Sequence, residues 1–366
     1  MGQRLRILAS FCLILSFSTL PNPKTGSSFK ASETTVVFLE DIDSGLTSPT
    51  GNYRWLDIAN QSYNQGYQAS YNYTQADVRV EFESIDTSLH GSLLASNLKP
   101  NFAYQLKLSG IQGTPANERI GLTGRWWQEE WNGSNWVNGQ NLNNKGDGSF
   151  PNPNDNLYFQ RRYISDFSSP TGLHYRFTGY LVFDYIISDD VGDVFLDFES
   201  DSSYHVLWKT SQRIRRTDDG PLLSARFDAD NSSAYEDSGG NDFPTQNISI
   251  FGEWERLPVG SVYLPIGDYT AQIYLTEESF HGSGGELSGN WAAAMGAELK
   301  FCIIDGSSTP VGSIIINDGE AYTKSASVNL SLSACDADSD VSQMRLSNDE
   351  STWNEWESYI TEKTWG

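Results

Sequence analysis

Apolar and polar residues alternate along most of the chain between residues 34 and 305. Val78, Val80 and Phe82 are separated by charged residues, and Tyr104 and Leu106 by a polar one. Successive side chains of a strand point to opposite faces of a sheet, so this period of two predicts strands with one buried face. Further stretches of this kind are 181–187, 194–198, 204–208 and 269–275. No window has a convincing helical period, and the pattern therefore predicts an all-β protein, a large antiparallel β-sandwich or jelly roll.

The turn and loop signals between residues 34 and 305 do not mark a clear domain boundary. Residues 189–192 predict a turn between two strands. The intervals 124–160 and 209–247 carry no clear strand pattern, and we expect them to be long loops, which are often functional. We expect one domain over 34–305, and a split into 33–165 and 166–305 is the alternative.

The first residues have the pattern of a secretory signal. Arg4 and Arg6 form a basic start, 7–17 is apolar, and Ser16 and Ser18 are small residues suited to cleavage before the next residue. The apolar stretch is shorter than the roughly 20 residues that span a membrane. We therefore expect residues 1–18 to be a signal peptide, 19–33 to be a disordered lead-in, and the mature protein to be extracellular or on the cell surface.

The C-terminal part carries a more specific pattern. It runs Ile314-Ile315-Ile316-Asn317-Asp318-Gly319, then the strand-like stretches 328–334 and 341–349, then Trp353 and Trp356. This resembles the immunoglobulin-like, fibronectin-type repeat of secreted and surface proteins of bacteria and archaea. The resemblance covers 310–366 and implies an incomplete Ig-like β-sandwich over 314–366, preceded by a linker at 306–313. In such repeats further strands follow the tryptophans, so we expect this one to be truncated.

A second resemblance lies late in the main region. The segment Leu257-Pro258-Val259-Gly260 leads through 261–266 into Gly267-Asp268-Tyr269-Thr270. It resembles the strand–turn–strand of carbohydrate-binding jelly rolls over about 20 residues.

The charge balance excludes several partners. The chain has 24 basic and 47 acidic residues and a net charge of −23. Nucleic acids and anionic lipid surfaces require clustered Lys and Arg, so neither is expected as a partner. The aromatic share of 13% is far above that of a disordered acidic chain. Polysaccharides and other surface proteins remain as expected partners.

Two cysteines remain after removal of the signal. Cys302 and Cys335 both lie on the polar parity of their strand patterns, on either side of the boundary near residue 308. The sequence favours separate cysteines and leaves a disulfide between them open.

The sequence offers little for catalysis. There are four histidines and no G-x-S-x-G elbow, and Ser283 lies in a glycine-rich stretch. The neighbouring acids Glu129 and Glu130, and likewise Glu277 and Glu278, are candidates for glycoside hydrolysis, but neighbours on a strand point to opposite faces. A metal at Glu278, His281 and Glu286 is less expected than a polar loop, and His205 is expected to be structural.

Calcium is the more plausible metal, although no cofactor is certain. Asp336, Asp338 and Asp340 form a D-x-D-x-D run whose oxygens suit a hard cation, but the glycine and acid that an EF-hand needs further on are absent. Asp228, Asp230 and Glu236 form a second acidic stretch. In both places solvated acids are the simpler interpretation.

The clearest binding signal is a tryptophan cluster. Trp126, Trp127, Trp131 and Trp136 lie among Asn, Gln and Glu. Flat aromatic faces stack on sugar rings, and the polar neighbours suit sugar hydroxyls. The alternative is that Trp126 or Trp127 caps the core and that the remaining rings pin the loop. We therefore expect a non-catalytic structural or adhesion protein with glycan recognition at these residues, or else a secreted carbohydrate-active enzyme. Six N-x-S/T sequons, about as many as chance gives, add nothing without a glycosylating host.

Overall fold

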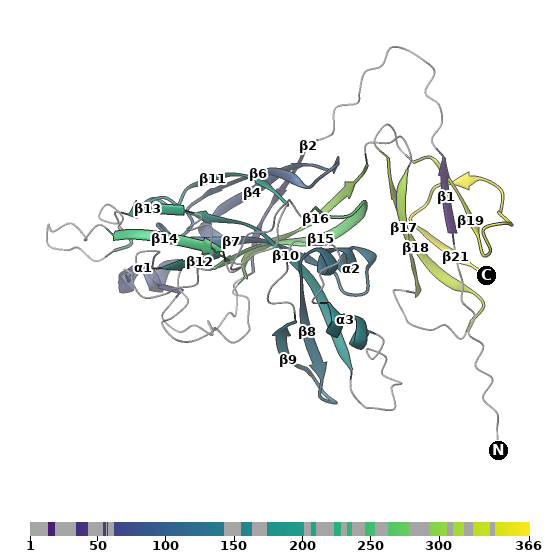
Figure 1. Ribbon diagram of the computed structural model, residues 1–366. Coiled ribbons are helices and arrows are strands. Elements are labelled where there is room, and N and C mark those ends of the chain that lie inside the picture. The colour runs from purple at the N-terminus through teal and green to yellow at the C-terminus, as the bar shows by residue number, and fades with distance from the viewer. Residues whose placement is uncertain are drawn as a thin grey trace, which may run out of the picture.

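The computed structural model is an all-β fold, as the alternation predicts (Figure 1). Described here are residues 14–18, 34–42, 54–55, 57, 62–142, 155–162, 174–200, 206–209, 223–227, 233–235, 246–252, 263–277, 293–305, 310–317, 325–336 and 341–366. In these ranges the strands pair antiparallel with one exception, β5 on β16. None of the helices in them is long and apolar enough to cross a membrane.

The largest sheet has eight strands. Its order is β3-β16-β15-β7-β10-β8-β9, and β5 adds to β16. The bounds are β3 Glu40–Asp41, β5 Ile85–Asp86, β7 Ala103–Gly110, β8 Arg125–Trp131, β9 Trp136–Asn141, β10 Tyr175–Ile187, β15 Gly267–Glu277 and β16 Ala293–Ile303. Every residue of the central strand β7 is buried.

A second sheet packs on the first and closes the sandwich. It has the order β11-β6-β4-β2, with β2 Thr34–Phe38, β4 Asp77–Glu83, β6 His90–Ser96 and β11 Val194–Glu199. The core between the two sheets joins the inward residues of both, including Val80 and Leu93 from one and Leu106 and Ile273 from the other. The parity expected for 78–82, 104–108 and 269–275 is therefore confirmed.

Strand β10 departs from the expected parity. Its register to β7 shifts between Val182 and Asp184, which marks a β-bulge. Because one extra residue flips the following side chains, Ile186 and not Ile187 is buried in the core. The turn predicted at 189–192 forms, with Gly192 at φ 90°. The chain after it crosses to the other sheet, where β11 pairs with β6.

The two predicted long loops contain regular structure. The interval 124–160 holds β8, β9 and most of helix α3, Asn156–Arg161. The interval 209–247 holds β13, Leu223–Phe227, which pairs with β14, Gln246–Gly252; β12, Val206–Lys209, pairs with β14 on its other side. Tryptophan favours strands, but the Asn- and Gly-rich residues around these tryptophans are typical of a loop. The sequence therefore predicted a loop where the β8–β9 hairpin forms.

Two further α-helices and a 3₁₀ helix interrupt the strands. Helix α1 is Gln65–Ser70, and a one-turn 3₁₀ helix spans Tyr73–Gln75. Helix α2, Pro115–Thr123, begins at an N-cap where the Thr114 hydroxyl accepts the Asn117 N–H, with Pro115 in the first turn. The Thr-Pro pair is a helix-start signal, but the surrounding strand pattern led us to expect no helix there.

The C-terminal residues form a separate small core. Strands β17 Val311–Ile316, β18 Val328–Cys335 and β21 Glu362–Trp365 make one sheet, and β19 Gln343–Ser347 pairs with β20 Glu357–Ser358. Leu330, Leu332, Met344 and Leu346 are buried between them. Since β17 begins at Val311, the end of the expected linker 306–313 is a strand; residues 306–309 lie outside the described ranges.

Strand β1, Ile14–Ser18, pairs with β19 in the register Ile14↔Ser347 to Ser18↔Gln343. These residues belong to the predicted signal peptide. Removal of the signal would therefore expose the β19 edge, so this pairing would be a feature of the precursor. The lead-in 19–33 and residues 1–13 lie outside the described ranges.

Cys302 and Cys335 form a disulfide, which corrects the expectation of separate cysteines. It joins the end of β16 to the end of β18, across the expected domain boundary. Cys302 is buried, although its parity in β16 matches that of Lys300 and Glu298, because its sulfur is bonded to Cys335 of the C-terminal segment. The Ser313 and Ser333 hydroxyls also donate to the Asp268 carboxylate there, so the junction has polar contacts as well.

Candidate functional site

The four predicted tryptophans lie on one hairpin, β8–β9, at the end of the large sheet. Trp131 is directly opposite Trp136, and Trp127 is opposite Asn141. Asn138, at φ 55°, supplies the extra residue of a bulge in β9. Strand β10 pairs with β8 from the other side, with Arg176 opposite Glu129 and Thr178 opposite Trp127. The register thus sorts these side chains onto two faces.

Trp126 is on the covered face and is a core residue. It is fully buried and stacks on Tyr158 of α3, with ring centroids 3.8 Å apart, and meets Phe177 edge to face. Gly121 of α2 is essential to this packing, because a Cβ there would lie 2.3 Å from the indole. For this residue the core interpretation holds, and Trp126 is corrected from a ligand-binding residue to a core residue.

Trp127, Trp131 and Trp136 share the opposite face and are only half-buried. The Trp127 ring lies across Gly139, which has no side chain to displace it. Trp131 and Trp136 meet at an interplanar angle of 60° with centroids 5.3 Å apart. These two rings are not coplanar, so they do not form the flat platform that a row of parallel rings would give.

An ion pair lies between the rings. Arg176 donates to both carboxylate oxygens of Glu129, at 2.6 and 2.8 Å. Its guanidinium also lies over the Trp136 ring, with Cζ 4.8 Å from the centroid. Trp127, Glu129, Trp131, Trp136 and Arg176 are called the tryptophan face below. Trp127 and Trp131 are four residues apart, so the two ends of this face are separated by roughly 13 Å.

A cleft of about 550 Å³ lies at the edge of the tryptophan face. Its lining includes Trp136, Tyr175 and Arg176, the charged residues Glu118 and Arg162, and Ile314–Ile316 of β17. Arg162 donates to Glu118 at 2.9 Å. Aromatic, charged and aliphatic groups therefore converge beside Trp136. Sequence reasoning missed Arg176 and Tyr175, because only the pairing of β10 with β8, more than 40 residues away, brings them here.

The carboxylate pairs proposed for hydrolysis are separated or neutralised. Glu129 and Glu130 point to opposite faces of β8, as neighbours on a strand do. Glu277 is buried at the end of β15, where one carboxylate oxygen accepts from Lys99 at 2.6 Å, Arg54 at 2.8 Å and Tyr73 at 2.8 Å. Burial alone would raise the pKa of Glu277, but Lys99 and Arg54 outweigh it and hold that pKa below its ordinary value. Glu277 is therefore suited to a structural role and not to donating a proton. Glu278, His281, Ser283 and Glu286 lie outside the described ranges, as does His205.

The calcium predictions stay predictions. Asp336 is buried, and Asp228, Asp230, Glu236, Asp338 and Asp340 lie outside the described ranges. Within the described part of the chain, no three His, Cys, Asp or Glu residues are grouped closely enough to hold a metal.

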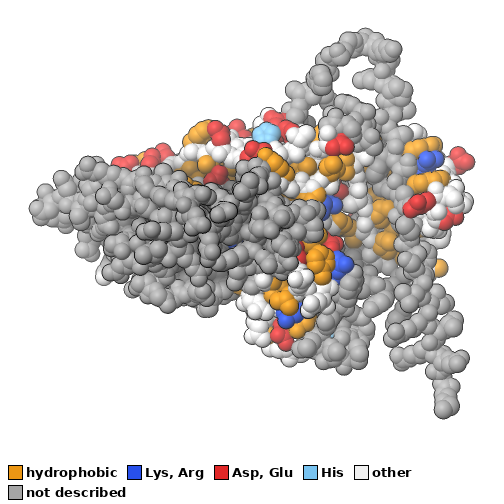
Figure 2. Space-filling model, viewed as in Figure 1, with side chains coloured by type: hydrophobic (Ala, Val, Ile, Leu, Met, Phe, Trp, Pro, Cys, Tyr) orange, Lys and Arg blue, Asp and Glu red, His pale blue; other side chains and the backbone are white. Residues whose placement is uncertain are grey.

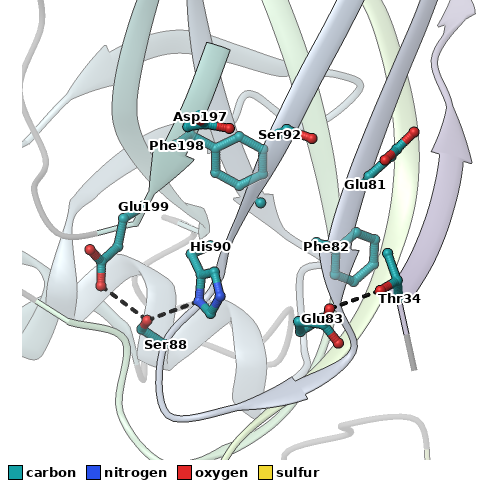
Figure 3. A pocket seen from close by; sticks show the side chains of 11 residues that line it. Thr34, Glu81, Phe82, Glu83, Ser88, His90, Ser92, Asp197, Phe198 and Glu199 are labelled. Carbon is teal, nitrogen blue, oxygen red and sulfur yellow. Dashed lines mark hydrogen bonds between the residues drawn. The ribbon is translucent and has the colours of Figure 1, made fainter. Parts of the chain in front are cut away.

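A second concave region lies on the outer face of the β11-β6-β4-β2 sheet (Figure 3). Its volume is about 790 Å³, and Glu81, Glu83, Asp197 and Glu199 line it together with Ser88 and His90. Gly91 lies in its floor between Phe82 and Phe198, where a Cβ would meet the Glu81 carbonyl at 2.2 Å. The outward acids of 78–83 were visible in the sequence, but which strands would lie beside them was not.

Comparison with known proteins adds no assignment: no family model matches the chain, and neither a curated protein nor a solved structure is significantly similar to it. Function is therefore inferred from the geometry of these surfaces.

Proposed function

We propose that this protein is a secreted, non-catalytic β-protein of the cell exterior that binds glycans through the tryptophan face. The observation that carries the proposal is the position of three half-buried tryptophans on one side of a hairpin whose fourth tryptophan fills the core. Half-buried indoles offer ring faces to a sugar, and a bidentate arginine–glutamate pair between them offers fixed donors and acceptors to hydroxyl groups.

The angle between Trp131 and Trp136 refines the proposal. Only one of these two rings can stack on a given sugar, so the second recognition point is Trp127, roughly 13 Å away. That spacing favours an oligosaccharide or polysaccharide over a single sugar. The resemblances to a carbohydrate-binding jelly roll and to an Ig-like surface repeat, together with the signal pattern, support an architectural or adhesive role outside the cell.

The test is a glycan array probed with the mature chain and with Trp136→Ala, beside a reducing-sugar assay on the captured glycans. We expect capture of a glycan class by the wild type, loss of that capture by Trp136→Ala, and no release of reducing ends. Trp356→Ala is the matched control, because Trp356 is 40% exposed and lies in the C-terminal segment. Release of reducing ends would favour the alternative, a secreted carbohydrate-active enzyme, and equal capture by all three proteins would refute binding at the tryptophan face.

A further inference from the structure

The outer face of the β11-β6-β4-β2 sheet is ordered into rows by its register. The core-facing residues alternate with outward residues that align across all four strands. The first row is Phe38, Arg79, Leu94 and Phe195; the second is Val36, Glu81, Ser92 and Asp197; the third is Thr34, Glu83, His90 and Glu199. These twelve residues are called the outer sheet face. In Figure 2, orange hydrophobic and red acidic side chains lie side by side along the upper surface, over these strands in Figure 1.

The first row forms an apolar strip that is interrupted by Arg79, whose guanidinium contacts Glu81 of the second row. Phe195 is 67% exposed and Phe38 is 60% exposed, and Val36 beside them in the second row is 46% exposed. Large apolar side chains scattered singly on a surface are ordinary, but here Phe195 and Phe38 lie in one row across the sheet, with the half-buried Leu94 and Arg79 between them. A strip of this kind is typical of a surface that a partner covers.

The second and third rows carry four carboxylates, and all of their residues except Val36 line the cavity of Figure 3. Within the outer sheet face as the structure describes it, the carboxylates of Glu81, Glu83, Asp197 and Glu199 are opposed by one cation, Arg79, whose Nε lies 3.0 Å from Glu81. The Thr34 hydroxyl donates to Glu83 at 2.9 Å and the Ser88 hydroxyl to Glu199 at 3.0 Å. An ionised carboxylate has about four acceptor positions, so these hydrogen bonds orient the groups and leave room for further donors.

The two halves of the face fit one kind of side chain. Neighbouring rows are about 6.7 Å apart, since they are two residues apart along each strand. Lys and Arg carry an apolar stem of similar length and a cationic head, and they place the stem on apolar surface and the head at polar groups. A stem on Phe195 or Leu94 therefore brings its head to the carboxylates of the next rows, where a charge-assisted hydrogen bond forms.

We propose that the outer sheet face binds a Lys/Arg-rich segment of a partner protein, at a site separate from the tryptophan face. Charge complementarity selects this occupant. A second copy of the chain is disfavoured because each copy has a net charge of −23 and would bring acids against acids. An amino-sugar polymer carries its nitrogen on the ring itself and has no apolar stem to span the distance of about 6.7 Å between the apolar row and the first carboxylates.

The test is binding of fluorescein-labelled octa-arginine to the mature chain by fluorescence anisotropy at 0.05 and 0.3 M salt. A strongly acidic protein attracts any polycation, so the variants carry the test. Asp197→Asn with Glu199→Gln removes two charges from exposed positions of the face, and Glu355→Gln with Glu362→Gln removes two from exposed positions elsewhere. We expect the first pair to weaken binding at least 10-fold and the second pair less than 2-fold.

A separate substitution tests the contribution of the apolar strip to binding. Phe195→Ala should weaken octa-arginine binding about 3-fold or more, while Val191→Ala, at a residue 64% exposed in the turn before β11, should not change it. Equal losses for the two charge pairs, or no effect of Phe195→Ala, would overturn the proposal. Binding of a hexamer of glucosamine in place of octa-arginine would also overturn it, because the ligand would then be a cationic glycan. Unchanged circular dichroism and melting temperature establish that each variant is folded.

Discussion

The buried ion cluster at the end of β15 makes the sharpest stability prediction. Glu277→Gln keeps the size of the side chain and removes its charge, leaving Lys99 and Arg54 without the carboxylate they share. The side chain of Glu277 is 6% exposed and that of Lys99 is fully buried. Lys99 also packs over the Trp55 and Phe102 rings, at 4.7 and 4.3 Å from Nζ to the centroids. Its ammonium group therefore cannot easily move out into solvent.

Removing one partner of a buried ion pair costs about 3–5 kcal/mol of unfolding free energy, because the other charge stays buried. For a domain of this size that lowers the melting temperature by roughly 10 °C. The control is Glu298→Gln, which breaks the exposed pair with Lys300 and should cost less than about 1 kcal/mol. Urea unfolding at pH 7, followed by tryptophan fluorescence, measures both variants.

The pH dependence of the unfolding free energy tests whether Glu277 is ionised in this cluster. Because the pKa of Glu277 is lowered in the folded state, its stabilisation is complete above the ordinary glutamate pKa of about 4.3 and is lost as the pH falls through the folded value. The difference in unfolding free energy between wild type and Glu277→Gln should therefore be constant above about pH 5 and shrink below about pH 4. A difference under 1 kcal/mol at pH 7, or one that does not change down to pH 3, would show that the cluster is not ionised as described.

Three further predictions concern the core, the disulfide and the N-terminus. Trp126→Ala should lower the unfolding free energy by about 3–5 kcal/mol in urea titrations, because it empties the space against Tyr158, whereas the half-buried Trp127→Ala should cost far less. Reducing the Cys302–Cys335 disulfide, which spans 33 residues, should cost up to about 4 kcal/mol, and oxidised and reduced protein unfolding at the same urea concentration would contradict a stabilising role. Mass spectrometry of the exported protein should find a chain beginning at Thr19, and a chain that retains 14–18 would mean that β1 stays on β19.

The sandwich could be predicted from the sequence because its core strands alternate strictly. Leu106 is flanked by Gln105 and Lys107, and Val80 by Arg79 and Glu81, so a period of two fixes their face wherever the strand pairs. The bulge in β10 could not be predicted, since it depends on how β7 lies beside that strand and leaves no mark in the composition. Cys302 was misplaced for a similar reason: its parity is polar, but its sulfur is bonded to Cys335 of the C-terminal segment.

Part of the tryptophan face could be predicted from the sequence, and part could not. Trp126 and Trp127 are adjacent, so a strand must send them to opposite faces, and one being in the core implies that the other is not. Their partners were hidden, because Arg176 approaches only through the pairing of β10 with β8. The acidic rows of the outer sheet face were hidden in the same way, since Glu83 and Glu199 belong to strands more than 100 residues apart.

The central proposal, glycan binding at the tryptophan face, is tested most directly by calorimetric titration of the captured oligosaccharide into wild type, Trp127→Ala, Trp136→Ala and Trp356→Ala. If the two ends of the face act as separate stacking points, each of the first two substitutions should weaken binding by about 10-fold, which corresponds to about 1.4 kcal/mol per lost ring contact, with melting temperatures close to wild type. Trp356→Ala should bind as the wild type does. Unchanged affinity in both Trp127→Ala and Trp136→Ala would contradict the account.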